Sequence, residues 1–287
     1  MQALFGQLLI GLINGAFYAM LSLGLAVIFG LLNIINFTHG AQYMLGAFAA
    51  YLLLDKLGIG YWWALLIVPV IIGITGVIIE RTMLSRLYKL DHLYGLLLTF
   101  GLALIFQGVF TNIYGSSGQP YRLPEEFAGA YNLGFMYLPK YRAWVVIASV
   151  AVCFSTWYVI ERTKLGAYLR AATENAALVQ AFGVNVPRMV TLTYGFGVGL
   201  AALAGVMAAP IYQVAPQMGA NMIIVVFAVV VIGGMGSIAG AIVTGFGLGI
   251  VEGLTKVFYP EASSTVIFVV MVIVLIFRPA GLFGKER

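Results

Sequence analysis

Two ionisable side chains lie within or beside long apolar stretches of the sequence. Glu252 falls inside the apolar run 238–258, and His39 falls near one end of the run 36–54. An ionisable residue at membrane depth often serves proton or ion coupling, so Glu252 is a candidate for that chemistry. The competing interpretation is an interfacial carboxylate that pairs with Lys256, one helical turn later. His39 fits either a gate or a hydrogen-bonded structural histidine.

Polar residues also cluster between the first two apolar stretches, where residues 33–42 read NIINFTHGAQ. This segment leaves almost no room for a loop. It indicates either a broken helix or an interfacial turn capped by Asn36 or Thr38. A broken helix is tolerated in a membrane where its free backbone groups are buried in protein or line a cavity. The sequence leaves both interpretations open.

The sequence lacks the common motifs of nucleotide-hydrolysing and metal-dependent enzymes. The patterns GxxxxGK[ST], HExxH, CxxC and GxSxG are absent, and the glycine runs at 195–199 and 245–249 lack the strand that precedes a nucleotide fingerprint. Cys153 is the single cysteine, which excludes a disulfide within the chain. We therefore expect no catalytic residue, no metal and no cofactor in this chain.

The elements that carry these residues have the composition of membrane helices. Of the 287 residues, 62% are hydrophobic and 9% are charged, whereas soluble domains are about 25% charged. The net charge of +5 does not indicate nucleic-acid binding, because the basic residues are few and follow the ends of apolar runs. The first apolar run lacks a basic start, so we expect a membrane span there and not a removable signal.

Nine apolar segments predict an all-α, polytopic membrane protein with about nine transmembrane helices, within a range of about eight to ten. They cover residues 8–31, 36–54, 62–79, 93–113, 142–160, 189–211, 218–235, 238–258 and 263–277. A separate soluble domain does not fit, so residues 1–287 form one domain. Gly245, Gly249 and Gly253 recur every four residues, which is typical of close helix packing in lipid.

Basic residues are divided unequally between alternate connections. The connections 80–92 and 161–188 and the tail 278–287 hold Arg81, Arg86, Lys89, Arg162, Lys164, Arg170, Arg188, Arg278, Lys285 and Arg287. The opposite side holds Lys56, Arg122, Lys140, Arg142 and Lys256. The positive-inside rule predicts that the first group faces the cytoplasm, with the N-terminus outside and the C-terminus inside.

Two connections are longer than ordinary loops. Residues 114–141, on the predicted outer face, indicate either a small hairpin or an irregular loop. Residues 161–188, on the predicted cytoplasmic face, contain good helix formers over Lys164–Phe182 and then Gly183, a common helix-terminating residue. We expect one or two short helices there, and Arg170 and Glu174 lie four residues apart on one face of such a helix.

Four ordered motifs resemble the high-affinity branched-chain amino-acid ABC permease family, and the resemblance covers nearly the whole chain. They are GLLNIINFTHG at 30–40, GAYLRAATENAALVQAFGVNV at 166–186, GGMGSIAG at 233–240 and FRPAGLFG at 277–284. The chain looks like the shorter of the two related permeases, because it lacks the longer N-terminal region often seen in the second.

The resemblance implies a subunit of a transporter in the bacterial inner membrane. Expected partners are a second related permease, two cytoplasmic ATPase subunits that use ATP and Mg²⁺, a periplasmic binding protein, and membrane lipid. The segment 161–188 looks like the family's coupling loop, which docks on the ATPase. The residues that we expect to take part in coupling are Gly166, Arg170, Ala171, Glu174, Asn175, Gly183 and Asn185.

Polar side chains on otherwise apolar helices are candidates for the solute path, although each is equally suited to bonding helices together. They are Asn14, Ser22, Asn36, His39, Thr99 and Gln107. We expect an ATP-driven importer subunit for branched-chain or other hydrophobic amino acids. Relatives for urea, amides or small carboxylates would have a similar sequence, and a stand-alone secondary transporter would require more embedded acidic residues than this chain offers.

Overall fold

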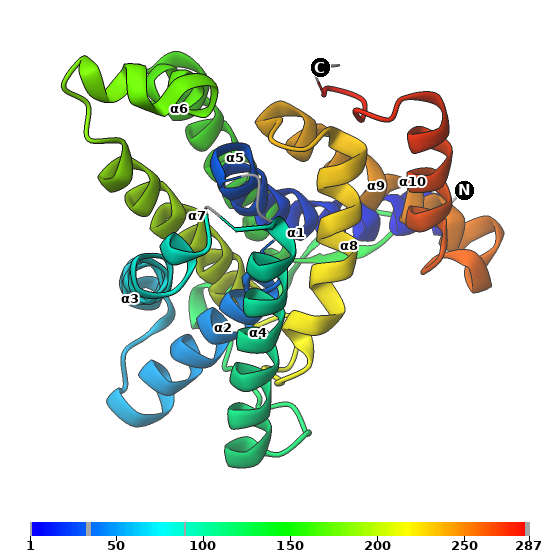
Figure 1. Cartoon of the computed structure of the whole chain (residues 1–287). Coiled ribbons are helices and arrows are strands. Elements are labelled where there is room, and N and C mark those ends of the chain that lie inside the picture. Colours follow the sequence, from blue (N-terminus) through cyan, green and yellow to red (C-terminus); the bar gives the residue numbers. More distant parts are fainter. Residues whose placement is uncertain (1, 33–35, 89, 285–287) are drawn as a thin grey trace.

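The computed structural model describes residues 2–32, 36–88 and 90–284, and these are mainly helical (Figure 1). The long helices are α1 (Gln2–Leu32), α2 (Thr38–Leu57), α3 (Tyr61–Thr82), α4 (His92–Tyr114), α5 (Lys140–Arg162), α6 (Lys164–Ala181), α7 (Val186–Ala208), α8 (Met218–Gly233), α9 (Ile238–Phe258) and α10 (Val266–Phe277). Each of the nine predicted apolar segments coincides with one helix, and α6 forms within the segment 161–188. The prediction of an all-α polytopic membrane protein is confirmed.

Six of the described helices are long and apolar enough to cross a membrane, namely α1, α3, α4, α5, α7 and α9. Helices α8 and α10 are apolar but shorter than 18 residues. Helix α2 has sufficient length, but its first turns contain Thr38, His39 and Gln42. The chain is thus a multi-pass membrane protein in which three helices of the predicted nine are short or partly polar.

Helix α1 lies at the centre of the bundle. Every residue from Gly15 to Ile28 is buried, and α1 packs against α5, α7, α8 and α9. An apolar helix without a polar face suits this position, because protein surrounds it on all sides. In contrast, only Gly95 and Thr99 of α4 are buried. The core therefore follows α1, while α4 lies at the periphery.

Glycines allow the backbones of α1 and α9 to touch. A Cβ atom added to Gly249 would lie 2.3 Å from the carbonyl oxygen of Gly11, and one added to Gly253 would lie 2.4 Å from that of Gln7. Gly245 meets the backbone of Ala19 in the same way. Small residues give membrane helices the close contact that lipid-facing apolar side chains cannot supply. The predicted packing role of the four-residue glycine repeat is confirmed.

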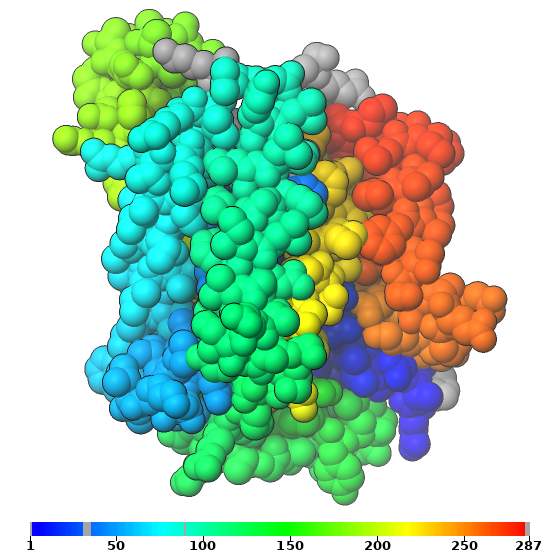
Figure 2. All heavy atoms as spheres, turned by 60° about the horizontal axis from the view of Figure 1, so that its bottom comes forward, coloured from blue at the N-terminus to red at the C-terminus, as the bar shows by residue number. Residues whose placement is uncertain are grey.

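The connections gather at two opposite ends of the bundle. Figure 2 shows α6, in lime, at one end and residues 114–141, in green, at the other. The Phe5 ring of α1 lies 5.8 Å from the Phe135 ring, which places the start of α1 beside residues 114–141. At the α6 end, the Leu282 N–H donates to the Ile232 carbonyl oxygen of α8. The beginning of α1 and the segment after α10 therefore lie at opposite ends.

The distribution of basic residues follows this division. The α6 end holds Arg81, Arg86, Arg162, Lys164, Arg170, Arg188 and Arg278, and the opposite end holds Lys56, Arg122, Lys140, Arg142 and Lys256. Lys89, Lys285 and Arg287 lie outside the described residues. The grouping of loops made from sequence agrees with this arrangement, which does not by itself decide which end faces the cytoplasm.

Residues 114–141 form a small hairpin and not an irregular loop. They contain the short helix η2 (Glu125–Phe127) and the antiparallel strands β1 (Ala130–Asn132) and β2 (Tyr137–Pro139). Gly134 adopts a φ of 81°, and its N–H donates to the Asn132 side chain at 2.9 Å, which closes the turn. A bridge between Gln119 and Val214 attaches the segment to the connection before α8.

We predict that Gly249→Val destabilises the protein far more than Gly247→Val. A side chain at Gly249 would collide with the α1 backbone, whereas a Cβ at Gly247 meets nothing within 4 Å. Overpacking costs about 1–3 kcal/mol in ordinary cores, and a backbone collision should reach the upper end of that range. Melting temperatures of the two variants in lipid nanodiscs test this, and equal values would contradict it.

Candidate functional site

Helix α6 protrudes from the bundle and exposes apolar side chains to its surroundings. Leu165, Tyr168 and Leu178 are exposed, and Phe182 at its end is 79% exposed. Ala171, one of the predicted coupling residues, is exposed as well. A large apolar side chain that is left open at a charged end of a membrane bundle is typical of a surface that binds another protein.

The first half of α6 is attached firmly to the end of α5. A Cβ atom on Gly166 would lie 1.5 Å from the Ile160 carbonyl oxygen, so only glycine fits there. Arg170 donates to the same carbonyl oxygen at 3.1 Å and forms an ion pair with Glu161 at 3.2 Å. Glu174, which the sequence places on the same helix face, is therefore not the partner of Arg170. The chain turns at Thr163, so that the end of α5 offers α6 both a backbone and a carboxylate acceptor.

Helix α6 is kinked at Asn175. This residue has φ −150° and ψ 88°, which lie outside the helical region. Its side-chain oxygen accepts a hydrogen bond from the Leu178 N–H at 2.9 Å, so it begins a second short helix in the manner of an N-cap. The structure thus has two helical pieces, which is one of the two arrangements predicted, and Glu174 lies at the junction.

The segment ends as the sequence predicts. Gly183 adopts a φ of 84° and terminates α6. The Asn185 side chain accepts a hydrogen bond from the Arg188 N–H at 3.1 Å and caps α7, and Pro187 follows in the first turn. The exposed Phe182 therefore lies between two defined helix ends. Sequence reasoning did not select Phe182, although a phenylalanine in a connection that is not apolar enough to span a membrane was a visible signal.

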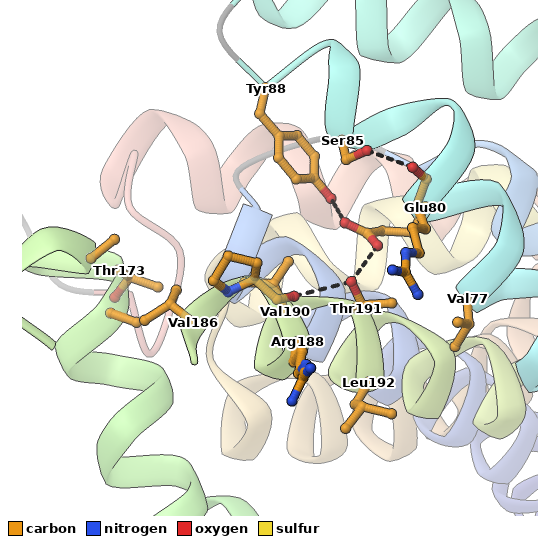
Figure 3. A pocket seen from close by; sticks show the side chains of 14 residues that line it. Val77, Glu80, Ser85, Tyr88, Thr173, Val186, Arg188, Val190, Thr191 and Leu192 are labelled. Carbon is orange, nitrogen blue, oxygen red and sulfur yellow. Dashed lines mark hydrogen bonds between the residues drawn. The ribbon is translucent and has the colours of Figure 1, made fainter. Parts of the chain in front are cut away.

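A pocket of about 870 Å³ lies between α3, α6 and the start of α7 (Figure 3). Its wall includes Glu80, which is only 2% exposed. Figure 3 shows Tyr88 and Thr191 on either side of this carboxyl group. Each donates a hydrogen bond of 2.6 Å from its hydroxyl, to Oε1 and Oε2 respectively. We call these three residues the Glu80 cluster.

The Glu80 cluster connects three parts of the chain beside α6. Glu80 lies in the last turn of α3, Tyr88 follows the short helix η1 (Leu84–Arg86), and Thr191 lies in the second turn of α7. Burial raises the pKa of Tyr88, and its hydrogen bond to Glu80 and the nearby carboxylate charge raise it further, so the phenol keeps its hydrogen as a donor. Sequence reasoning placed Glu80 in a loop because the apolar run stops at Ile79. The helix continues past it and buries it.

Asn36, His39 and Thr99 lie in the interior of the bundle and not at its surface. The Phe37 N–H donates to Thr99 Oγ1 at 3.3 Å, and Thr38 donates to the Thr99 carbonyl oxygen at 3.0 Å. His39 Nε2 lies 2.9 Å from the Leu21 carbonyl oxygen, eleven residues before the end of α1, a distance of about 16 Å along that helix. Helix α2 therefore begins at depth, as a broken helix would. Asn33 lies outside the described residues.

The start of α2 is stabilised by these contacts and not by a side-chain cap. Neither Asn36 nor Thr38 caps the helix, so the interpretation of a capped interfacial turn is wrong. The Asn36 side chain donates to the Tyr194 hydroxyl at 3.0 Å, while its Oδ1 atom has no partner in the described part of the protein. The Nδ1 atom of His39 is likewise buried without a partner there. Such atoms require water or a bound polar group.

The remaining polar candidates lie elsewhere. Ser22 donates to the Ala19 carbonyl oxygen at 3.1 Å and lies 3.4 Å from that of Ala241, as expected for bonding between helices. Gln107 lies on α4 beside a smaller pocket of about 190 Å³ between α2, α4 and α8. The six candidates for a solute path are thus divided among separate places.

Glu252 belongs to a hydrogen-bond network beside the first half of α1, and this network includes the sixth candidate, Asn14. The Lys256 ammonium group pairs with the Glu252 carboxylate, as predicted. Tyr18 donates to the same carboxylate at 2.7 Å and Asn14 does so at 3.3 Å, while Tyr212 donates to Asn14 at 3.2 Å. The pairing with Lys256 favours a structural role for Glu252 over proton coupling.

Comparison with known proteins extends over nearly the whole chain. High-affinity branched-chain amino acid transport system permease protein LivH of Escherichia coli K12 is 28% identical over 98% of this chain and 96% of its own length. The corresponding protein BraD of Pseudomonas aeruginosa is 29% identical over the same shares. A probable LivH permease of Methanocaldococcus jannaschii is 25% identical over 93% of this chain and 88% of its own length. No solved structure matches the chain.

A family model described as "Branched-chain amino acid transport system / permease component" matches residues 7–275, which include the protruding α6, the Glu80 cluster and the buried start of α2. Together with the near-complete alignment to three permeases and the multi-pass helical bundle, this match means that the chain belongs to the branched-chain amino acid transport permease family.

Proposed function

We propose that this chain is the translocation subunit of an ATP-driven importer in the bacterial inner membrane. Its solute is a branched-chain or other hydrophobic amino acid, delivered by a periplasmic binding protein. A second related permease completes the path, and two cytoplasmic ATPase subunits bind and hydrolyse ATP with Mg²⁺. The observation that carries the proposal is α6, a protruding helix with exposed apolar side chains at the more basic end of the bundle.

The basic end is then the cytoplasmic end. The positive-inside rule associates a surplus of Lys and Arg with the cytoplasmic connections. Under this orientation the start of α1 and the hairpin at 130–139 face the periplasm, where a binding protein would dock. The segment after α10 and α6 face the cytoplasm, where ATP is available.

The contacts of α6 suit a helix that transmits movement. Gly166 and Arg170 hold its first half on the end of α5, and Asn185 begins α7 directly after its second half. A partner that closes on Phe182 and Leu178 would therefore push on α5 and α7 together. The kink at Asn175 lies between the half of α6 that is attached to α5 and the half that leads into α7.

The buried start of α2 supports a path for a polar solute near the bundle centre. The unpartnered atoms of Asn36 and His39 provide hydrogen-bonding groups at depth. Among the described residues, none that lines the 190 Å³ pocket beside Gln107 is charged. A neutral or zwitterionic solute with an apolar side chain fits these surroundings better than a strongly charged one.

The requirement for ATP provides the first test. The test uses proteoliposomes that contain the chain with its partner permease, ATPase subunits and loaded binding protein. Leucine transport should require ATP on the side of the vesicle membrane where the ATPase subunits lie. Vesicles with the chain alone should show no uptake under a proton gradient. Gradient-driven uptake by the chain alone would instead support a secondary transporter.

A second test addresses docking on α6. We expect Phe182→Ser to abolish most copurification of the ATPase and to lower ATP-driven uptake at least tenfold, since a central exposed aromatic residue commonly dominates an interface. The fold should be unaffected, because Phe182 is 79% exposed. Phe258→Ser, at the other end of the bundle and 76% exposed, is the matched control. Equal copurification of the two variants would refute the assignment of this surface.

The Glu80 cluster extends the same mechanism to α3. Because Glu80 bonds to Thr191 near the start of α7, α3 should follow α7 when α6 moves. Tyr88→Phe removes one of the two hydroxyl donors from the buried carboxyl group, which should cost about 1–3 kcal/mol. We expect a lower melting temperature and fewer solutes transported per ATP hydrolysed.

Tyr158→Phe is the control for this variant, because Tyr158 is exposed on α5. A Tyr88→Phe variant with unchanged melting temperature and unchanged transport per ATP would show that the Glu80 cluster has neither a structural nor a coupling role.

A further inference from the structure

The pocket between α2, α4 and α8 has the shape and chemistry of a binding site. Its volume of about 190 Å³ equals about six water molecules. Helix α4 presents Ala103 and Gln107 to it, one turn apart on one face, and α2 presents Ala41 and Met44. Ile223 and Ile224 of α8 form the third wall. The walls are apolar, mostly aliphatic with two phenylalanine rings, and include one amide group.

Two phenylalanines, Phe37 and Phe100, line this pocket, and a third, Phe227 of α8, packs against Phe37. Phe37 precedes α2 and meets Phe100 of α4 at a ring distance of 6.0 Å, edge to face. It also meets Phe227 of α8 at 6.4 Å, in a stacked arrangement. We call these rings the phenylalanine layer. Aromatic pairs of this kind hold well-defined geometries.

The directions of α4 and α8 place the phenylalanine layer nearer than the rest of the pocket to the α6 end of the bundle. Helix α4 ends beside residues 114–141, so Gln107 is nearer to that end than Phe100. Helix α8 starts at the same end, since Val214 bridges to Gln119, so Ile223 is nearer to it than Phe227. The pocket thus lies between the hairpin end and a layer of aromatic rings.

The position of α4 gives the pocket a movable wall. Helix α4 packs mainly on α2, and of its residues only Gly95 and Thr99 are buried. Figures 1 and 2 both show α4 beside α8. A shift of α4 that separates Phe100 from Phe37 would break the two hydrogen bonds between Thr99 and the start of α2, but it would leave the buried α1 in place.

The composition of the walls identifies the ligand. An aliphatic side chain placed among Ala41, Ala103 and Ile223 is favoured, since its burial removes apolar surface from water. The Gln107 amide forms no side-chain hydrogen bond within the described residues, so it is available to a polar group of the ligand. A lipid acyl chain would fill the aliphatic part but would leave the amide without a partner in hydrocarbon.

We propose that this pocket is a specificity subsite for the solute, which takes the aliphatic side chain of an amino acid while Gln107 contacts its polar end. The phenylalanine layer closes the way to the inner half of the membrane until α4 moves. This inference rests on the proposed function as an amino-acid importer. It adds the residues that distinguish one side chain from another.

The test changes the size of the pocket in both directions in the assembled transporter, reconstituted in proteoliposomes with its partner subunits and binding protein. Ala103→Phe fills the pocket and should lower leucine uptake at least tenfold, a factor that even one methylene group can produce in such a site. Val109→Phe places the same ring on the opposite, exposed face of α4 and should leave uptake unchanged. Ile224→Ala enlarges the pocket at an exposed position and should raise uptake of phenylalanine relative to leucine.

A binding readout separates this subsite from a lipid-filled groove. Cys153 is buried, so Ala103→Cys introduces the accessible thiol, and leucine should slow its modification by a methanethiosulfonate reagent in the assembled complex. The subsite would be refuted if leucine did not slow modification of the thiol. It would also be refuted if Ala103→Phe took up leucine at the wild-type rate while Ile224→Ala kept the wild-type preference between leucine and phenylalanine. If the wild-type assembly moves no aliphatic amino acid, the proposed function itself fails and the subsite with it.

Discussion

The structure depends on the backbone contact between α1 and its neighbours. Lipid offers apolar side chains about the same surroundings as another helix does, so membrane helices gain most by close packing. Gly11, Gly245 and Gly249 bring α1 and α9 to backbone contact, and Gly197 of α7 lies against Gly24 of α1 in the same way. These contacts bury the middle of α1 completely. The other helices are arranged around this centre.

Helix α1 is packed tightly on one side, and on another side it adjoins the irregular backbone at the start of α2. The start of α2 inserts at depth, where His39 bonds to the Leu21 carbonyl oxygen and Thr38 bonds to that of Thr99. In lipid the exposed backbone of a broken helix would be costly, but here protein surrounds it. The same break places Phe37 against α4 and α8. A rigid centre and a peripheral α4 thus lie on opposite sides of α2.

The cytoplasmic mechanism that we propose combines an exposed surface on α6 with fixed attachments to the neighbouring helices. Helix α6 is bonded to α5 by Arg170 and joined to α7 through Asn185, while the Glu80 cluster joins α7 to α3. Movement imposed on α6 would therefore reach three long helices. Helix α4 has few buried residues and would respond by a shift of the whole helix. In this mechanism the tightly attached helices α3, α5 and α7 would transmit the movement of α6, and the loosely packed α4 would act as the gate.

The sequence by itself determined the class of the protein, the nine apolar helices, the helix within 161–188 and its end at Gly183. These features depend on local composition, on periodicity and on residues with strong backbone preferences, which do not require knowledge of the tertiary structure. The grouping of basic connections was predictable for the same reason. The ordered motifs also indicated the family, because each is a continuous stretch of sequence and does not depend on contacts between distant residues.

Only the tertiary structure decided which polar groups meet. Arg170 pairs with Glu161 and not with Glu174, because the chain folds back at the α5–α6 junction. Glu80 is buried by Tyr88 and Thr191, the latter 111 positions away in sequence. The six polar candidates for a path are divided among several places, and the pocket beside Gln107 exists only because α2, α4 and α8 converge. Contacts between distant residues depend on how helices cross, and helix crossing is set by packing in three dimensions.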